Sequence, residues 1–147
     1  MISGTVKLNV QIYSVLGLIP FLALGALFPL WPEIHQDRIQ QSFAQYAAII
    51  LAFMAGALWL PCIIDSEKFP QQGTTIAILL SLIAFLAMLL PTSPALVLTA
   101  SGFLLLLAIE TFQSWMRLYP GWYGSLRIML TSCVVFCHLL LGVWLWL

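Results

Sequence analysis

An acidic residue, Glu110, ends the apolar run that begins at Gly102, and two arginines follow it. Arg117 lies seven residues later on the same helical face, and Arg127 follows the turn sequence YPGWYG. An arginine can bind a carboxylate through two parallel hydrogen bonds, which satisfies both groups and would fasten two helices together. Acids within membranes also relay protons or contact ligands. We favour a structural ion pair with Arg127, with Arg117 as the other candidate partner, and the relay and ligand alternatives stay open.

A histidine and two cysteines near the end of the chain are the nearest approach to a metal site. Cys133 and Cys137 share a helical face, but His138 is rotated by about 100° from Cys137. No fourth ligand follows, and the spacing does not match a zinc pattern. We therefore expect no metal, and we interpret His138 as bonded to a backbone carbonyl or to a neighbouring helix.

The chain contains no recognisable catalytic motif. His35 stands between Glu33 and Asp37, which are two residues away on either side and so do not share its helical face. We expect a solvated loop histidine there. There is no nucleophile elbow, phosphate loop or zinc-protease motif. The sequence accordingly predicts a protein that is not an enzyme and has no cofactor.

The composition indicates that these residues are carried by a membrane protein. Of the 147 residues, 63% are hydrophobic and 7% are charged, whereas soluble proteins have roughly 25% charged residues. The five basic residues are scattered and form no patch for a phosphate backbone, which argues against nucleic acid as a partner. The expected partners are the lipid bilayer and either other membrane proteins or further copies of this chain.

Five apolar segments approach the roughly 20 residues that a helix needs to cross a bilayer. We therefore predict an all-α, polytopic membrane protein, a single domain over residues 1–147 built as a bundle of five transmembrane helices. Pro20 should kink the first helix. The predicted helices span residues 12–30, 43–64, 75–90, 94–115 and 125–146.

The basic residues predict the orientation of this bundle. Five crossings place Lys7, Lys68, Arg117 and Arg127 on one side and only Arg38 on the other. Because cytoplasmic loops carry an excess of lysine and arginine, we expect a cytoplasmic N-terminus and a periplasmic C-terminus in the inner membrane.

Small residues recur every four positions in the second predicted helix: Ala44, Ala48, Ala52 and Gly56. Such a stripe lets helix backbones approach closely, and this packing drives helix association in lipid. We expect this face to pack within the bundle, with a face for another protein as the alternative.

Two stretches resemble a known family. The sequences YAAIILAFMAGALW, from Tyr46 to Trp59, and YPGWYGSLRIMLT, from Tyr119 to Thr131, are similar to those of the transmembrane protein 69-like family of small bacterial and mitochondrial membrane proteins. The resemblance covers nearly the whole chain and implies five helices in an inner membrane, but it brings no established activity. The residues matched to the family motifs are Tyr46, Trp59, Pro120, Trp122, Tyr123 and Arg127.

These observations favour one functional interpretation and leave a second open. The short loops, the small-residue stripe and the scarcity of ionisable groups favour a non-enzymatic inner-membrane helical bundle, an accessory or assembly subunit that packs with other membrane proteins. The alternative is a small lipid- or quinone-binding membrane protein or transporter that uses the region of Glu110 and Arg127.

Overall fold

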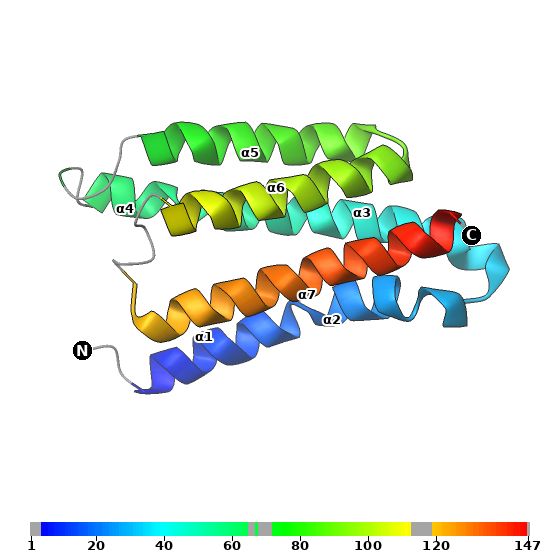
Figure 1. Ribbon diagram of the computed structural model, residues 1–147, viewed down its shortest axis with the longest axis horizontal. Helices are drawn as coiled ribbons and strands as arrows, with labels where there is room; N and C mark the ends of the chain where they lie inside the picture. The colour runs from blue at the N-terminus through cyan, green and yellow to red at the C-terminus, as the bar shows by residue number, and fades with distance from the viewer. Residues whose placement is uncertain (1–3, 65–66, 68–71, 113–118, 147) are drawn as a thin grey trace.

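The computed structural model describes residues 4–64, 67, 72–112 and 119–146, and over these residues it is helical and without strands. The all-helical fold expected from the sequence is thus confirmed for this part of the chain. The helices lie side by side along one long axis, and the two ends of the chain lie at opposite ends of the molecule (Figure 1). In chain order they are α1 (Gly4–Leu16), α2 (Ile19–Phe21), η1 (Leu22–Ala26), η2 (Phe28–Leu30), α3 (Glu33–Gly56), α4 (Trp59–Ile64), α5 (Gln72–Leu89), α6 (Thr92–Phe112) and α7 (Gly121–Trp146).

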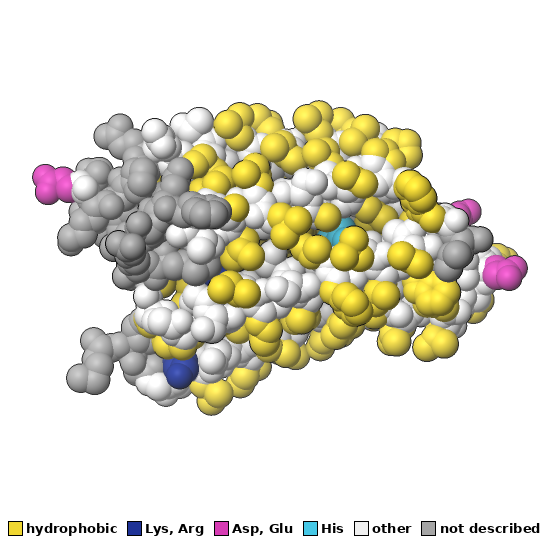
Figure 2. Space-filling model, in the orientation of Figure 1, with side chains coloured by type: hydrophobic (Ala, Val, Ile, Leu, Met, Phe, Trp, Pro, Cys, Tyr) yellow, Lys and Arg dark blue, Asp and Glu magenta, His cyan; other side chains and the backbone are white. Residues whose placement is uncertain are grey.

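Four helical segments among the described residues are long and apolar enough to cross a membrane, which indicates a multi-pass membrane protein. They are Gly4–Ala26, Gln72–Leu89, Thr92–Thr111 and Gly121–Trp146. Apolar side chains cover the middle of the face drawn in Figure 2, and acidic side chains stand at its two ends. This distribution fits a bilayer whose core surrounds the middle of the bundle.

The second predicted span, residues 43–64, is not among these four segments, and its predicted course as one helix is wrong. The helix begins ten residues earlier, at Glu33, and ends at Gly56, so that α4 is a separate short helix. Four glutamines, Gln36, Gln40, Gln41 and Gln45, lower the mean hydropathy of its N-terminal part, together with the charged residues Asp37 and Arg38. Because α3 contacts α5, α6 and η1, neighbouring helices replace lipid along part of its surface.

The first apolar helical segment, Gly4–Ala26, is interrupted close to Pro20, where the sequence predicted a kink. α1 ends at Leu16, and Pro20 occupies the first turn of α2, where its missing N–H costs no hydrogen bond. The following η1 is a π-helix, in which the Leu27 N–H donates to the Leu22 carbonyl. Across the break, the Tyr46 hydroxyl of α3 donates to the Gly17 carbonyl at 2.9 Å. The carbonyl freed by the irregular backbone is thereby satisfied inside the protein.

The residues of α3 that are buried against other helices are not the four that the sequence predicted. Ala44 and Ala48 are buried, but Ala52 is only partly buried and Gly56 is exposed. A Cβ at Gly56 would meet nothing within 4 Å, so the predicted close approach there is wrong. A spacing of four residues drifts by about 40° per repeat around a helix of 3.6 residues per turn. The face that is buried instead comprises Phe43, Ala44, Ala47, Ala48, Leu51 and Ala55.

Close backbone approach occurs at two other glycines. A Cβ at Gly102 of α6 would lie 2.5 Å from the Leu51 side chain of α3. A Cβ at Gly25 of η1 would lie 2.6 Å from the Phe43 ring and 3.3 Å from Cβ of Cys137. These glycines therefore set how closely α3 packs against α6 and how closely η1 packs between α3 and α7.

Candidate functional site

A buried ion pair joins the end of α6 to the beginning of α7. Arg127 donates from Nε to Oε2 of Glu110 at 2.8 Å and from Nη2 to Oε1 at 2.5 Å. The side chains are 3% and 6% exposed, respectively. The antiparallel arrangement of α6 and α7 brings together two residues that are 17 positions apart. The fork of two parallel bonds compensates both charges and fixes the plane of the guanidinium.

The third arginine nitrogen has a weaker partner. Nη1 of Arg127 contacts the sulfur of Met54, on α3, at 3.2 Å. A thioether is a weak acceptor, and a guanidinium has five N–H groups to place. The ion pair thus leaves Nη1 able to donate to a better acceptor.

Aromatic residues surround the same end of the bundle. The Tyr119 and Tyr123 rings lie 4.7 Å apart, and the ammonium group of Lys7, on α1, lies 5.8 Å from the centre of the Trp122 ring. Burial, with a smaller contribution from Tyr123, raises the pKa of the Tyr119 hydroxyl above its ordinary value of 10.0. Tyr119 is therefore a neutral hydrogen-bonding group at physiological pH.

Beside the ion pair, a cavity of about 500 Å³ lies between α1, α2, α3 and α7. Its walls are mainly apolar. Polar groups reach it from two sides: Tyr123, Arg127 and Thr131 from α7, and Ser14 from α1. The three α7 residues follow one another at intervals of four, so they lie along the same side of the helix.

Thr131 has a hydroxyl with no protein partner among the described residues. Only 6% of the residue is exposed, but no fully buried side-chain oxygen or nitrogen in this part of the chain lacks a partner, so the exposed part includes the hydroxyl oxygen. Hydroxyls on membrane helices usually bond to the carbonyl four residues earlier. Ser81 and Thr111 do so in this protein, but Thr131 does not. Because Thr131 lines the cavity, its hydroxyl is available to a molecule inside it.

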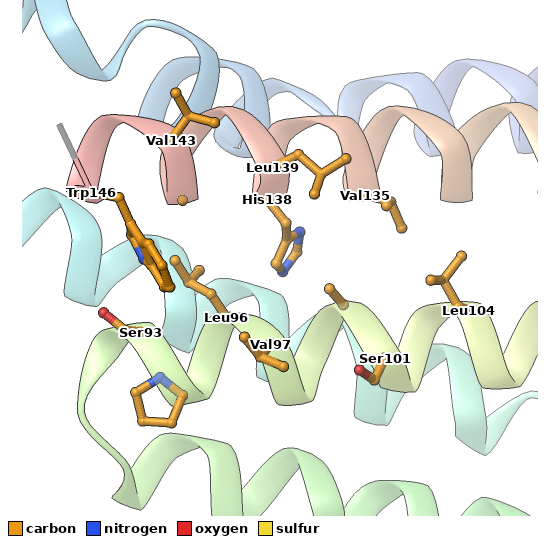
Figure 3. Close-up of a pocket in the computed structure, with 13 residues that line it drawn as sticks. Ser93, Leu96, Val97, Ser101, Leu104, Val135, His138, Leu139, Val143 and Trp146 are labelled. Carbon is orange, nitrogen blue, oxygen red and sulfur yellow. The ribbon is translucent and has the colours of Figure 1, made fainter.

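A second hollow, of about 610 Å³, lies between α6 and α7. Figure 3 shows His138 extending from α7 towards α6, between the apolar side chains of the groove. Both ring nitrogens of His138 have hydrogen-bond partners. Nδ1 donates to the Val134 carbonyl at 2.8 Å, and Nε2 lies 3.0 Å from the Thr99 hydroxyl. Because the Val134 carbonyl can only accept, Nδ1 of the neutral ring carries the hydrogen and Nε2 is the acceptor. The single hydroxyl hydrogen of Thr99 lies within reach of both Nε2 and the Ala95 carbonyl, so the two acceptors share it. The groove is larger than the cavity, but its histidine is already satisfied.

Thr99→Val should destabilise the protein by about 1 kcal/mol, because hydrogen bonds between membrane helices contribute roughly that much. The substitution leaves Nε2 of His138 without its partner on α6. Unfolding in mixed detergent micelles would measure the change. Thr111→Val is the matched control, since the Thr111 hydroxyl is exposed and bonds to a carbonyl of its own helix. Equal stability of the two variants would show that the bond between α6 and α7 contributes nothing.

The remaining residues singled out from the sequence do not come together in one place. Arg117 lies outside the described residues, so its part in the ion pair is not addressed. His35 is exposed, but it stands in the first turn of α3 and not in a loop. Trp59 is exposed on α4, and Pro120 precedes α7. No group of three possible metal ligands occurs among the described residues.

Sequence reasoning assigned no functional or packing role to Thr131, Gly25 or Gly102. Thr131 was detectable in principle, because it stands four residues after Arg127 and so shares its helical face. The two glycines carry no comparable signal. Their importance depends on which side chains of α3 oppose them.

A model of one protein family, described as a protein of unknown function (DUF3429), matches residues 6–143. Because this match covers most of the chain, the protein belongs to the DUF3429 family. An uncharacterised family was expected from the sequence, while the likeness to the transmembrane protein 69-like family remains a resemblance. No curated protein and no solved structure matches the chain.

Proposed function

We propose that this member of the DUF3429 family is a non-enzymatic membrane protein that holds a small lipid-like molecule in the cavity between α1, α3 and α7. The observation that carries the proposal is a mainly apolar cavity of about 500 Å³ with a few convergent polar groups on its wall. Sites for small molecules have this volume and this mixture of surfaces.

The ion pair supports a binding role better than a catalytic one. Glu110 and Arg127 are bonded to each other through both carboxylate oxygens, so neither is free to exchange a proton with a substrate. Their pairing instead fixes the position of Arg127, which lines the cavity. A polar group held in this way orients a ligand without a loss of side-chain freedom on binding.

Two leucine-to-tryptophan substitutions on α7 test the location. Leu130 lines the cavity, and Leu139 lines the groove between α6 and α7. Native mass spectrometry of protein purified in mild detergent should detect one bound lipid or quinone in the wild type. Leu130→Trp should fill the cavity and remove this ligand, and Leu139→Trp should retain it. Loss in Leu139→Trp alone would place the ligand in the groove.

An accessory or assembly role is the second candidate, with α1 as the observation that favours it. None of the 13 residues of α1 is buried, so this helix offers a long surface to another membrane protein or to a second copy of this chain. The same purification separates the two roles. A stoichiometric protein partner in place of a bound small molecule would support the accessory role.

We further propose an inner-membrane location in which α3 provides the fifth crossing, with the N-terminus cytoplasmic and the C-terminus periplasmic. The excess of basic residues on one side supports this orientation. The placement of the two ends of the chain at opposite ends of the bundle supports an odd number of crossings (Figure 1). A reporter fused after Leu147 should be active only in its periplasmic form. Cytoplasmic activity there would contradict the orientation or the fifth crossing.

A further inference from the structure

The polar groups of the cavity carry information about the head group that it would accept. This inference rests on the proposed function, because it concerns the same cavity. We propose that the ligand is a neutral lipid whose head group presents two carbonyl-type oxygens to α7, as a quinone ring does, and not an anionic lipid.

The first argument comes from charge. The positive charge of Arg127 is already compensated by Glu110, whose two oxygens both accept hydrogen bonds from it. No other charged side chain lines the cavity in the described part of the chain. An anionic head group would therefore bring a second negative charge to one arginine, and burial of an uncompensated charge is strongly unfavourable. A neutral head group avoids that cost.

The second argument comes from the hydrogen-bonding groups. Nη1 of Arg127 can only donate, and its partner in the protein is the weakly accepting sulfur of Met54. The hydroxyls of Thr131, Tyr123 and Ser14 can also donate, and within the described residues none of them bonds to the protein. Each hydroxyl can accept as well as donate, but Nη1 can only donate. A head group with acceptor oxygens can therefore bond to all four groups.

The third argument comes from arrangement and shape. Arg127 and Thr131 are about one turn apart on the same side of α7, and both line the cavity. Two acceptor oxygens of one head group can therefore face the two residues together. Tyr13 lines the same cavity and is largely exposed, and aromatic side chains stack favourably on a flat ring. The apolar tail would leave past Phe53, whose side chain is exposed on the bundle surface.

Binding to three probes tests the head group. The full chain, freed of lipid by detergent exchange, is titrated with decylubiquinone, with the neutral ester monoolein and with anionic oleate, and binding is followed by tryptophan fluorescence and thermal unfolding. We expect decylubiquinone to bind more tightly than monoolein, whose carbonyl is single, and oleate to bind at least tenfold more weakly than decylubiquinone. Preference for oleate would overturn the neutral head group, and preference for monoolein would overturn the quinone-like ring.

Thr131→Val tests the contact itself. The substitution keeps the shape of the side chain and removes a hydroxyl that has no protein partner, so the fold should be at least as stable as before. Affinity for decylubiquinone should fall about tenfold, and affinity for oleate should be unchanged. The control is Thr111→Val, at an exposed position outside the cavity. Equal decylubiquinone affinity in the two variants would overturn the assignment of Thr131.

The outcomes also separate this inference from the proposed function. If oleate or monoolein binds in preference to decylubiquinone, and Leu130→Trp abolishes that binding, the cavity is a ligand site with a different preference. If none of the three probes binds the wild type, both the head-group assignment and the proposed function are wrong.

Discussion

Arg127→Gln should destabilise the bundle by about 3 to 5 kcal/mol, because it removes one member of a buried ion pair and leaves the other charge without compensation. The carboxylate that remains belongs to Glu110, whose side chain is 6% exposed. Glutamine keeps much of the length of arginine but supplies no charge and no fork of parallel N–H groups. Unfolding in mixed micelles, followed by circular dichroism, would measure the loss.

The double substitution distinguishes an ion pair from two independent contributions. Glu110→Gln alone leaves the Arg127 guanidinium without its counter-charge. It should therefore lower the stability of the bundle by a similar amount to Arg127→Gln. In the protein with both substitutions, two neutral amides can bond to each other, so the combined loss should be smaller than the sum of the single losses. Additive losses would show that the two side chains do not interact in the folded protein.

Gly25→Ala should destabilise the protein by about 1 to 3 kcal/mol, the usual cost of adding a methyl group to a packed core. The new Cβ would lie 2.6 Å from the Phe43 ring, which is fully buried, and 3.3 Å from Cβ of Cys137. Neither the ring nor the α7 backbone can move aside without disturbing the other contacts of the core. Thermal unfolding in detergent would measure the effect.

Gly56→Ala is the matched control for Gly25→Ala. Gly56 ends α3, is exposed, and has open space where the Cβ would stand. Alanine is favoured over glycine in helices by roughly 0.5 to 1 kcal/mol, so this variant should be as stable as the wild type or slightly more so. A larger loss at Gly56 than at Gly25 would contradict the packing described here.

The sequence predicted the features that depend on local pattern. Long apolar segments predicted the helices, because a helix is the simplest way to satisfy every backbone group in lipid. The tight turn before α7 predicted that Glu110 and Arg127 would meet, because a short turn makes the flanking helices antiparallel neighbours. Pro20 correctly marked the irregular part of the first pass, since proline restricts the backbone wherever it occurs.

Features that depend on three-dimensional context were predicted poorly. The apolar pattern of α3 is diluted by Gln40, Gln41 and Gln45, so its course from Glu33 follows from its contacts with α5 and α6 and not from its own hydropathy. Counting every fourth residue put Gly56 on the packed face, because the drift of that spacing around the helix was not taken into account. The cavity is formed by helices far apart in the sequence, so no single segment could reveal it.

The break between α1 and α2 divides the first pass into a peripheral part and an anchored part. α1 has no buried residue, whereas Phe21 and Gly25, beyond the break, are buried against α3 and α7. Local opening is least costly where few buried contacts must be lost. The free energy needed to separate α1 from the rest of the bundle is therefore much smaller than the free energy of unfolding the whole protein. The wall of the cavity formed by α1 is therefore the part of the bundle whose opening costs least, and its opening towards the lipid would give a membrane-dissolved molecule a direct lateral route to the buried arginine.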